Sequence, residues 1–306
     1  MEEFNKDLLK QLATPLSGSH KGQNGKLLLI GGSHLFHAAS AWALKVASRI
    51  VDMVFYSSVP ENNQIILEAK KEFHDGIVVP REKIDDYINE ADCVLIGPGM
   101  LRAEARSAKL EVRSLADINR LEDEGEQTYY LTKYLLEKYP QKRWVIDAGA
   151  LQMLEPEWLS GLDEVIITPH QGEFEGLKVR SSKFEVRSTM RDDDVKQFAQ
   201  EFGCVVLLKG EKDIVCPPSL GEAGSPDRCV NVSGGNAGMT KGGTGDVLAG
   251  LVAALACKND LFLAACAGSY INKKAGEFLF DKIGYVFNTS DLVEVIPVVM
   301  KKELAT

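Results

Sequence analysis

A glycine-rich stretch, GGNAGMTKGGTGDVLAG at 234–250, combines residues that bind phosphate with a carboxylate that could act on it. Its centre is Gly242-Gly243-Thr244-Gly245-Asp246, and the apolar run that follows, 247–256, predicts a helix. Glycine leaves backbone N–H groups accessible and tolerates positive φ. A helix N-terminus adds unpaired N–H donors at the positive end of the helix dipole. We therefore expect an anion-binding cradle suited to phosphate.

Asp246 has two interpretations. A carboxylate in this cradle would repel an anion, so its presence favours chemistry: it could take a proton from a hydroxyl group that attacks phosphorus. The alternative is structural, because aspartate commonly caps a helix after a glycine-rich turn. The stretch is neither a Walker A loop, which needs Gly, four residues and Gly-Lys-Ser/Thr, nor a GxGxxG dinucleotide fingerprint.

The elements that must position this stretch alternate between strands and helices. Apolar runs predict strands at 26–30, 53–57, 93–96, 143–146, 164–167 and 204–208, and two short strands within 213–232. Helices are predicted at 3–12, 38–50, 84–89, 247–256, 260–280 and 290–303, and within 103–138, with a break near 122–126. This alternation predicts an α/β fold with a mainly parallel central sheet and helices on both faces.

Several predicted strands end in glycine or polar residues, namely Gly31-Gly32-Ser33, Gly97-Pro98-Gly99, Asp147, Thr168-Pro169-His170 and Lys209-Gly210. Each could be an ordinary turn or surface residue. If the strands are parallel, however, all of them meet at the edge where open α/β sheets bind ligands. Lys209 could neutralise a phosphate. His170 could contact a ligand or be an ordinary loop histidine, and Glu173 could cap the helix that follows.

Composition limits the classes of function. The 306 residues carry a net charge of −9, which gives no basic surface for nucleic acid. No apolar run is long enough to span a membrane, and the N-terminus is unlike a signal peptide. The six cysteines form no CxxC pair, so we expect buried free thiols in a reducing compartment and a soluble, cytoplasmic protein. The histidines show no zinc spacing, and no GxSxG hydrolase elbow is present.

Taken together, these motifs resemble the ADP- or ATP-dependent NAD(P)H-hydrate dehydratases, a branch of the ribokinase-like superfamily. The resemblance covers the chain from about His20 to the C-terminal helix. It is carried by His20-Lys21-Gly22 with Gly25, LLLIGGS at 27–33, DCVLIGPGM at 92–100, VIDAGAL at 145–151, ITPHQGEFEGL at 167–177, VVLLKG at 205–210 and GNAGMTKGGTGDVLAG at 235–250.

The resemblance implies a ribokinase-like three-layer α/β/α sandwich, with residues 1–306 as a single domain and a helical insertion at about 103–140. It implies a lyase that phosphorylates the ring hydroxyl of hydrated NADH or NADPH with ADP or ATP, and then eliminates phosphate. ADP is the expected donor, with Mg²⁺ bridging the nucleotide phosphates, and a homotetramer is the expected assembly. The implied roles are Asp246 as general base; Gly242, Gly243, Thr244 and Gly245 as anion hole; Lys209, Gly210, Glu211, Lys212, Asp213 and Gly245 at the nucleotide; and Ala39, Gly99, His170 and Asp246 at the hydrate.

The chain departs from the family pattern in places. Phe36-His37-Ala38-Ala39-Ser40 stands where Tyr-Ser-Gly-Ala-Pro is usual, and Gly149, Ala237 and Lys241 replace an Asp, a Pro and a small residue. Lys241 could contact phosphate or point to solvent, and we favour solvent. Two other functions stay open: a kinase of the same fold acting on a vitamin precursor or sugar, and a nucleotide-binding regulatory protein without catalysis.

Overall fold

The computed structural model describes residues 1–103, 112–181, 183–184, 192–218 and 229–305. Its centre is one sheet of ten strands in the order β1-β10-β9-β8-β7-β6-β5-β2-β3-β4. The strands are β1 Glu2–Glu3, β2 Lys26–Ile30, β3 Met53–Ser57, β4 Ile77–Val78, β5 Cys93–Ile96, β6 Arg143–Ile146, β7 Glu164–Ile167, β8 Val205–Leu208, β9 Asp213–Cys216 and β10 Val230–Val232. Strand β9 runs against its neighbours β8 and β10, while the other described pairings are parallel.

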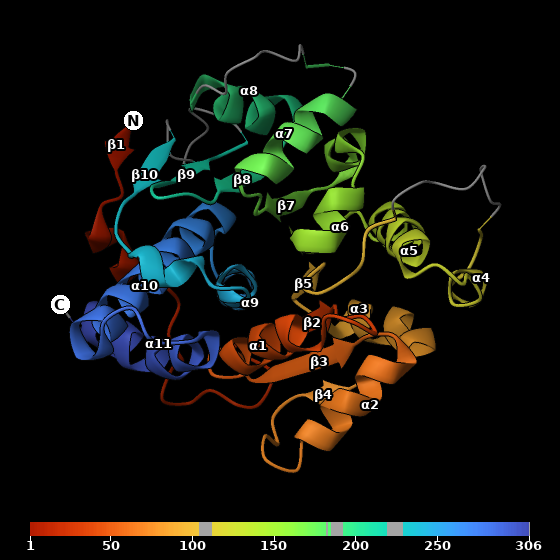
Figure 1. Ribbon diagram of the computed structural model, residues 1–306, viewed down its shortest axis with the longest axis horizontal. Helices are drawn as coiled ribbons and strands as arrows, with labels where there is room; N and C mark the ends of the chain where they lie inside the picture. The colour runs from red at the N-terminus through yellow and green to blue at the C-terminus, as the bar shows by residue number, and fades with distance from the viewer. Residues whose placement is uncertain (104–111, 182, 185–191, 219–228, 306) are drawn as a thin grey trace.

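Helices cover both faces of this sheet (Figure 1). They are α1 His37–Ala47, α2 Pro60–Ala69, α3 Ile84–Glu90, α4 Leu115–Ile118, α5 Glu124–Lys138, α6 Ala148–Met153, α7 Gln171–Arg180, α8 Asp192–Phe202, α9 Thr244–Ala256, α10 Leu261–Ile283 and α11 Thr289–Leu304. Short 3₁₀ helices are η1 Lys6–Gln11, η2 Arg81–Lys83, η3 Pro156–Gly161 and η4 Ala237–Thr240. The predicted three-layer α/β/α architecture is confirmed.

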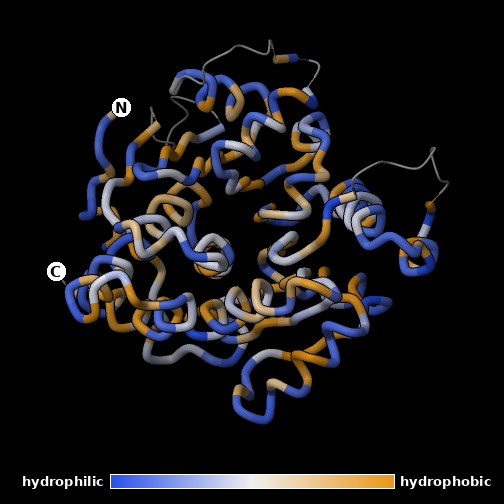
Figure 2. The backbone as a smooth tube through the Cα atoms, in the orientation of Figure 1, coloured by the Kyte–Doolittle hydropathy of each residue, from blue (hydrophilic) through white to orange (hydrophobic). Residues whose placement is uncertain are grey.

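Alternate side chains of each strand enter two separate hydrophobic clusters, as the two-residue period of a strand requires. Leu27 and Leu29 of β2 pack with α1, α9, α10 and α11, whereas Leu28 and Ile30 pack on the opposite face with α3, α5, α7 and α8. Burial on both faces explains why the strands read as continuous apolar runs. Figure 2 shows hydrophobic residues gathered inside the molecule and hydrophilic ones along the outer loops.

The structure corrects two predictions, one about the N-terminal helix and one about the cysteines. The helix predicted at 3–12 is shorter and of another type: it is a 3₁₀ helix over Lys6–Gln11, capped by Asn5, and Glu2–Glu3 pairs with β10 instead. The free-thiol prediction fails for Cys216, the last residue of β9, and Cys229, the residue before β10: they form a disulfide, because the antiparallel pairing of Val215 with Val230 brings them together. The other four cysteines are buried and free, as predicted.

The insertion predicted at about 103–140 contains α4 and α5, and residues 104–111 lie outside the described part of the chain. Asp123 caps α5 through the backbone N–H of Glu126, which places the predicted break between the two helices. That the whole chain forms a single domain stays a prediction.

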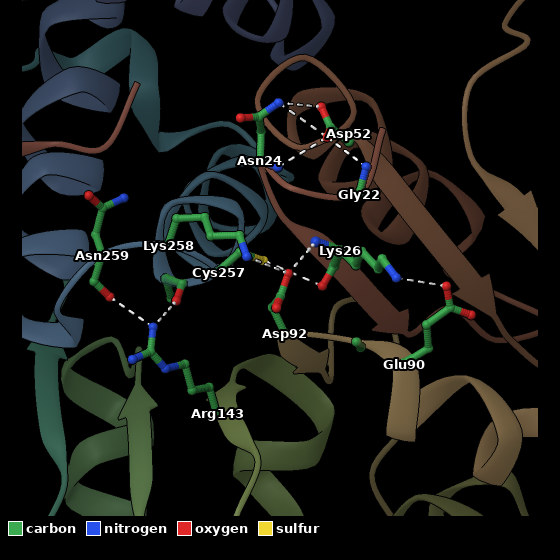
Figure 3. A network of polar contacts seen from close by, with 12 residues as sticks. Gly22, Asn24, Lys26, Asp52, Glu90, Asp92, Arg143, Cys257, Lys258 and Asn259 are labelled. Atoms are coloured by element: carbon green, nitrogen blue, oxygen red, sulfur yellow. Dashed lines mark hydrogen bonds and ion pairs between the residues drawn. The ribbon is translucent and has the colours of Figure 1, made fainter. Parts of the chain in front are cut away.

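Helix α9 packs on one face of the sheet against β5 and β6. Its C-terminal end is held at the amino ends of those strands (Figure 3). Arg143 of β6 donates to the carbonyl oxygens of Ala256 and Asn259, at 2.9 and 3.1 Å. Lys258 forms an ion pair with Asp92, at 3.2 Å. A cation at a helix C-terminus is stabilised by the helix dipole. These contacts fix one end of α9, and the other end is the glycine-rich stretch.

Candidate active site

The glycine-rich stretch forms the N-terminus of α9. Gly243 is the N-cap with φ 98°, a left-handed conformation that favours glycine. A Cβ added there would lie 2.2 Å from Cζ3 of Trp42 in α1, so the turn also requires glycine for space. The Thr289 hydroxyl donates to the Gly242 carbonyl at 2.7 Å and supports the turn from α11. The loop is therefore held in place by neighbouring elements.

Asp246 is not the helix cap. The cap is Gly243, which has no side chain, and Asp246 is the third residue of α9. The structural interpretation of Asp246 as a capping residue is therefore wrong. Its carboxylate stays available for another role.

Lys209 and Asp147 meet beside Asp246, as the convergence of strand ends predicts. Lys209 Nζ lies 2.8 Å from Asp147 Oδ1, and the Thr168 hydroxyl donates to the same oxygen at 2.8 Å. Burial alone would lower the pKa of Lys209, but the charges of Asp147 and Glu173 outweigh it and raise that pKa. These charges favour the protonated form of Lys209 at the N-terminus of α9.

The same environment perturbs Asp246. Burial and the negative charge of Asp147 together raise the pKa of Asp246 to about 7, against the opposing positive charge of Lys209. A carboxyl group with its pKa near neutrality can accept a proton in one step and release it in the next. Such perturbation is typical of catalytic groups.

A cavity of about 730 Å³ opens beside Gly245. All the residues expected at the nucleotide line it, namely Lys209, Gly210, Glu211, Lys212, Asp213 and Gly245. The cavity is also lined by residues to which the sequence analysis gave no role, among them Ser233, Met239, Leu248, Asn272 and Lys273. Asn272 and Lys273 are polar residues in a buried part of α10, and that pattern was the available signal.

The residues expected at the hydrate lie at the same sheet edge but outside this cavity lining. Gly99 has φ 73°, and a Cβ there would lie 3.0 Å from the Cβ of Ala39, so these two positions adjoin. His170 caps α7 in a capping box with Glu173, as predicted for Glu173, and pairs with Lys209 in an isolated bridge. Its side chain is 58% exposed, so it can cap the helix and still face a ligand.

Two departures from the family pattern have physical explanations. A Cβ at Gly149 would lie 2.1 Å from the Met100 carbonyl oxygen, so an aspartate cannot fit there without moving the backbone. Lys241 donates to the Tyr285 carbonyl and lies 4.9 Å from the centre of the Phe287 ring. It is exposed, but these contacts hold it against the neighbouring loop.

Within the described residues, no group of three or more His, Cys, Asp or Glu side chains could hold a metal ion. No described helix is long and apolar enough to cross a membrane. Any metal at this site would therefore need ligands from elsewhere, such as the phosphates of a nucleotide.

Comparisons with known proteins show the family to which the chain is similar. Residues 27–298 match the family described as NAD(P)H-hydrate dehydratase. The ADP-dependent (S)-NAD(P)H-hydrate dehydratase of Nitrosopumilus maritimus is 34% identical, with 93% of this chain and 91% of that protein covered. The bifunctional NAD(P)H-hydrate repair enzyme of Methanocaldococcus jannaschii is 33% identical over 96% of this chain, which spans 51% of that relative's length.

Solved structures support the fold. A ribokinase-like superfamily protein from Enterococcus faecalis superposes with a TM-score of 0.74 at 22% identity, covering 100% of this chain and 97% of that one. The ADP/ATP-dependent NAD(P)H-hydrate dehydratase of Bacillus subtilis, co-crystallized with ATP and Mg²⁺, superposes with a TM-score of 0.73 at 20% identity, covering 99% of this chain and 98% of that one. The predicted ribokinase-like fold is confirmed.

Proposed function

The chain belongs to the NAD(P)H-hydrate dehydratase family. From this premise we propose that it converts hydrated NADH or NADPH back to the reduced cofactor, with ADP as the phosphoryl donor. The observation that carries the proposal is the position of Asp246. It has a pKa of about 7 and stands at the N-terminus of α9, beside the cavity lined by Lys209–Asp213. We propose ADP rather than ATP as the phosphoryl donor, because two relatives are named as ADP-dependent.

The chemistry follows from the placement of the groups. Asp246 takes the proton of the ring hydroxyl, and the hydroxyl oxygen attacks the terminal phosphorus of ADP, so that AMP leaves. The backbone N–H groups of Gly242–Gly245, at the positive end of α9, stabilise the charge that develops on the transferred group. Phosphate then leaves with its C–O bond electrons, a proton leaves the adjacent ring carbon, and the ring double bond is restored.

Lys209 and Asp147 support this step. Lys209 presents a fixed positive charge toward the phosphates, and the ion pair with Asp147 holds its ammonium group in place. Ala39, Gly99 and His170 are assigned to the hydrate, because they lie at the same sheet edge but outside the lining of the cavity beside Gly245.

The donor set fits Mg²⁺ that arrives with the nucleotide. Mg²⁺ is usually held by one or two carboxylates together with substrate phosphates. Asp147 would be the shared carboxylate through its second oxygen, because Oδ1 already binds Lys209 and Thr168. When bound, Mg²⁺ would neutralise phosphate charge during transfer.

The direct test is recovery of absorbance at the reduced-nicotinamide band. The protein is mixed with chemically hydrated NADH and Mg²⁺, and ADP and ATP are supplied separately. Recovery with ADP supports the proposal, and recovery with ATP alone would show that ATP is the phosphoryl donor. A stable phosphorylated product without recovery would indicate the kinase function instead, and nucleotide binding without any turnover would indicate the regulatory one.

We also propose that the protein acts in the cytoplasm, where ADP and reduced nicotinamides occur together, and that it assembles as a homotetramer. Light scattering coupled to size-exclusion chromatography tests the assembly: a mass of four chains is expected, and a monomer at assay concentration would contradict it.

A further inference from the structure

One buried polar atom in the wall of the cavity has no partner. Asn272 of α10 is 4% exposed and lines the cavity, and its amide oxygen Oδ1 makes no hydrogen bond within the described part of the protein. Buried polar groups in folded proteins are nearly always paired, because an unpaired one has lost its water without compensation. An orphaned acceptor at the edge of a ligand cavity therefore indicates that the ligand supplies the donor.

The polar neighbours of Asn272 on the same helix are already engaged. Lys273 Nζ donates to the carbonyl oxygens of Gly210 and Glu211, at 3.1 and 3.0 Å, and the Ser269 hydroxyl donates to Asp213 at 2.7 Å. These contacts hold the segment that lines the cavity. Asn272 Oδ1 takes no part in these hydrogen bonds, so nothing in the described part of the chain accounts for a buried acceptor at this position.

The composition of the cavity suggests which part of a nucleotide reaches Asn272. Gly245 and Lys209 define the phosphate end, whereas Ala237, Met239 and Leu248 give the cavity apolar lining that suits the faces of a base. A side-chain amide matches the edge of adenine: the oxygen accepts from the 6-amino group and the NH₂ group donates to a ring nitrogen. Hypoxanthine carries a 6-oxo group instead, which would face Oδ1 as a second acceptor.

We propose that Asn272 recognises the adenine base of the bound nucleotide, with Oδ1 accepting a hydrogen bond from its 6-amino group. The inference rests on the proposed function, since it takes the cavity to be the ADP site. It makes Asn272 a specificity-determining residue rather than a catalytic one.

Calorimetric binding of ADP and IDP to the full chain tests this proposal, because these nucleotides differ at the 6-position of the base. Wild type is expected to bind ADP about ten-fold more tightly than IDP, the value of one well-made hydrogen bond. Asn272→Leu is expected to weaken ADP about ten-fold and to bring both affinities within about two-fold. Asn272→Ala should show the same two changes in affinity. Thermal unfolding checks that each variant is folded.

The control is Thr240→Val. Thr240 lines the same cavity, but its hydroxyl donates to the Ala237 carbonyl at 2.9 Å, so the ratio of ADP to IDP affinity should not change. Equal affinities of wild type for ADP and IDP would overturn the proposal without any variant. If Asn272→Leu lost affinity for ADP and IDP by the same factor, the proposal would also be overturned, and a contact with the ribose would be indicated. If wild type bound neither ADP nor ATP, the proposed function itself would fail.

Discussion

Replacing Asp246 by asparagine is expected to make the protein more stable and much less active. The variant keeps the shape of the side chain and removes its charge. Because a general base typically contributes about 10²–10⁴-fold, turnover should fall by that factor while nucleotide still binds. Stability should rise, because the wild-type carboxylate is ionised at a half-buried site that disfavours its charge.

The size of this gain follows from the two pKa values of Asp246, 3.8 as the ordinary value and about 7 in the folded protein. Between these values the folded state binds a proton that the unfolded state has lost, so the contribution of Asp246 to wild-type stability is greatest below pH 3.8 and falls until the pH passes 7. Each unit of pH in this window is worth about 1.4 kcal/mol. The asparagine variant should therefore be more stable by about 4 kcal/mol at pH 8, and by about 2 kcal/mol at pH 5. Solvent screening makes these figures upper bounds.

Denaturant unfolding of both proteins at pH 5 and pH 8 measures this difference. The exposed Asp163→Asn is the matched control and should change stability by less than about 0.5 kcal/mol at either pH. If Asp246→Asn were less stable than wild type at pH 8, or if the difference did not grow with pH, the argument that burial raises this pKa would be refuted. Wild-type turnover in the variant would refute the assignment of the base.

The remaining predictions concern pH, the glycine turn and the disulfide. Below pH 7, kcat/KM of wild type should fall about ten-fold per unit of pH, because only ionised Asp246 accepts the proton; a flat profile from pH 5.5 to 8 would contradict this. Gly243→Ala should lower Tm and turnover, since its methyl group would meet Trp42, whereas Gly242→Ala, which meets nothing within 4 Å, is the control for Tm alone. Replacing both disulfide cysteines, 13 residues apart, by serine should cost about 3 kcal/mol of stability in chemical unfolding, and an unchanged midpoint would contradict a stabilising bond.

The strands could be predicted because burial on both faces makes each one a continuous apolar run. The predicted bounds of 26–30, 53–57, 93–96, 143–146 and 164–167 match the observed strands. Helix α8 was missed although one of its faces is apolar, because Asp192-Asp193-Asp194 at its start resembles a surface loop. Strand β1 was missed because its two exposed glutamates have no strand pattern and depend on pairing with β10.

Part of the site could be predicted from the sequence, because several of its residues come directly after predicted strands. Lys209 and Asp147 could be placed at one edge, but their ion pair depends on the order of strands in the sheet, which spacing alone does not give. Asn272 was not given a role from the sequence, since polar residues within α10 show that a buried polar site exists but not which ligand or cavity they face. The disulfide depends on the pairing of β9 with β10, and the sequence shows only two separated cysteines.

Because Arg143 anchors the C-terminal end of α9, the amino ends of the strands help to set the position of Asp246, the proposed base, at the other end of the helix. Thirteen residues at 1.5 Å each make α9 a rod of about 20 Å, and a rod fixed at one end transmits displacement to the other. Gly250 lets this rod lie directly on α1, since a Cβ there would come within 2.7 Å of the Ala43 backbone. Residues at the opposite end of α9 thus help to set the position of the glycine-rich loop, although they lie outside the proposed site.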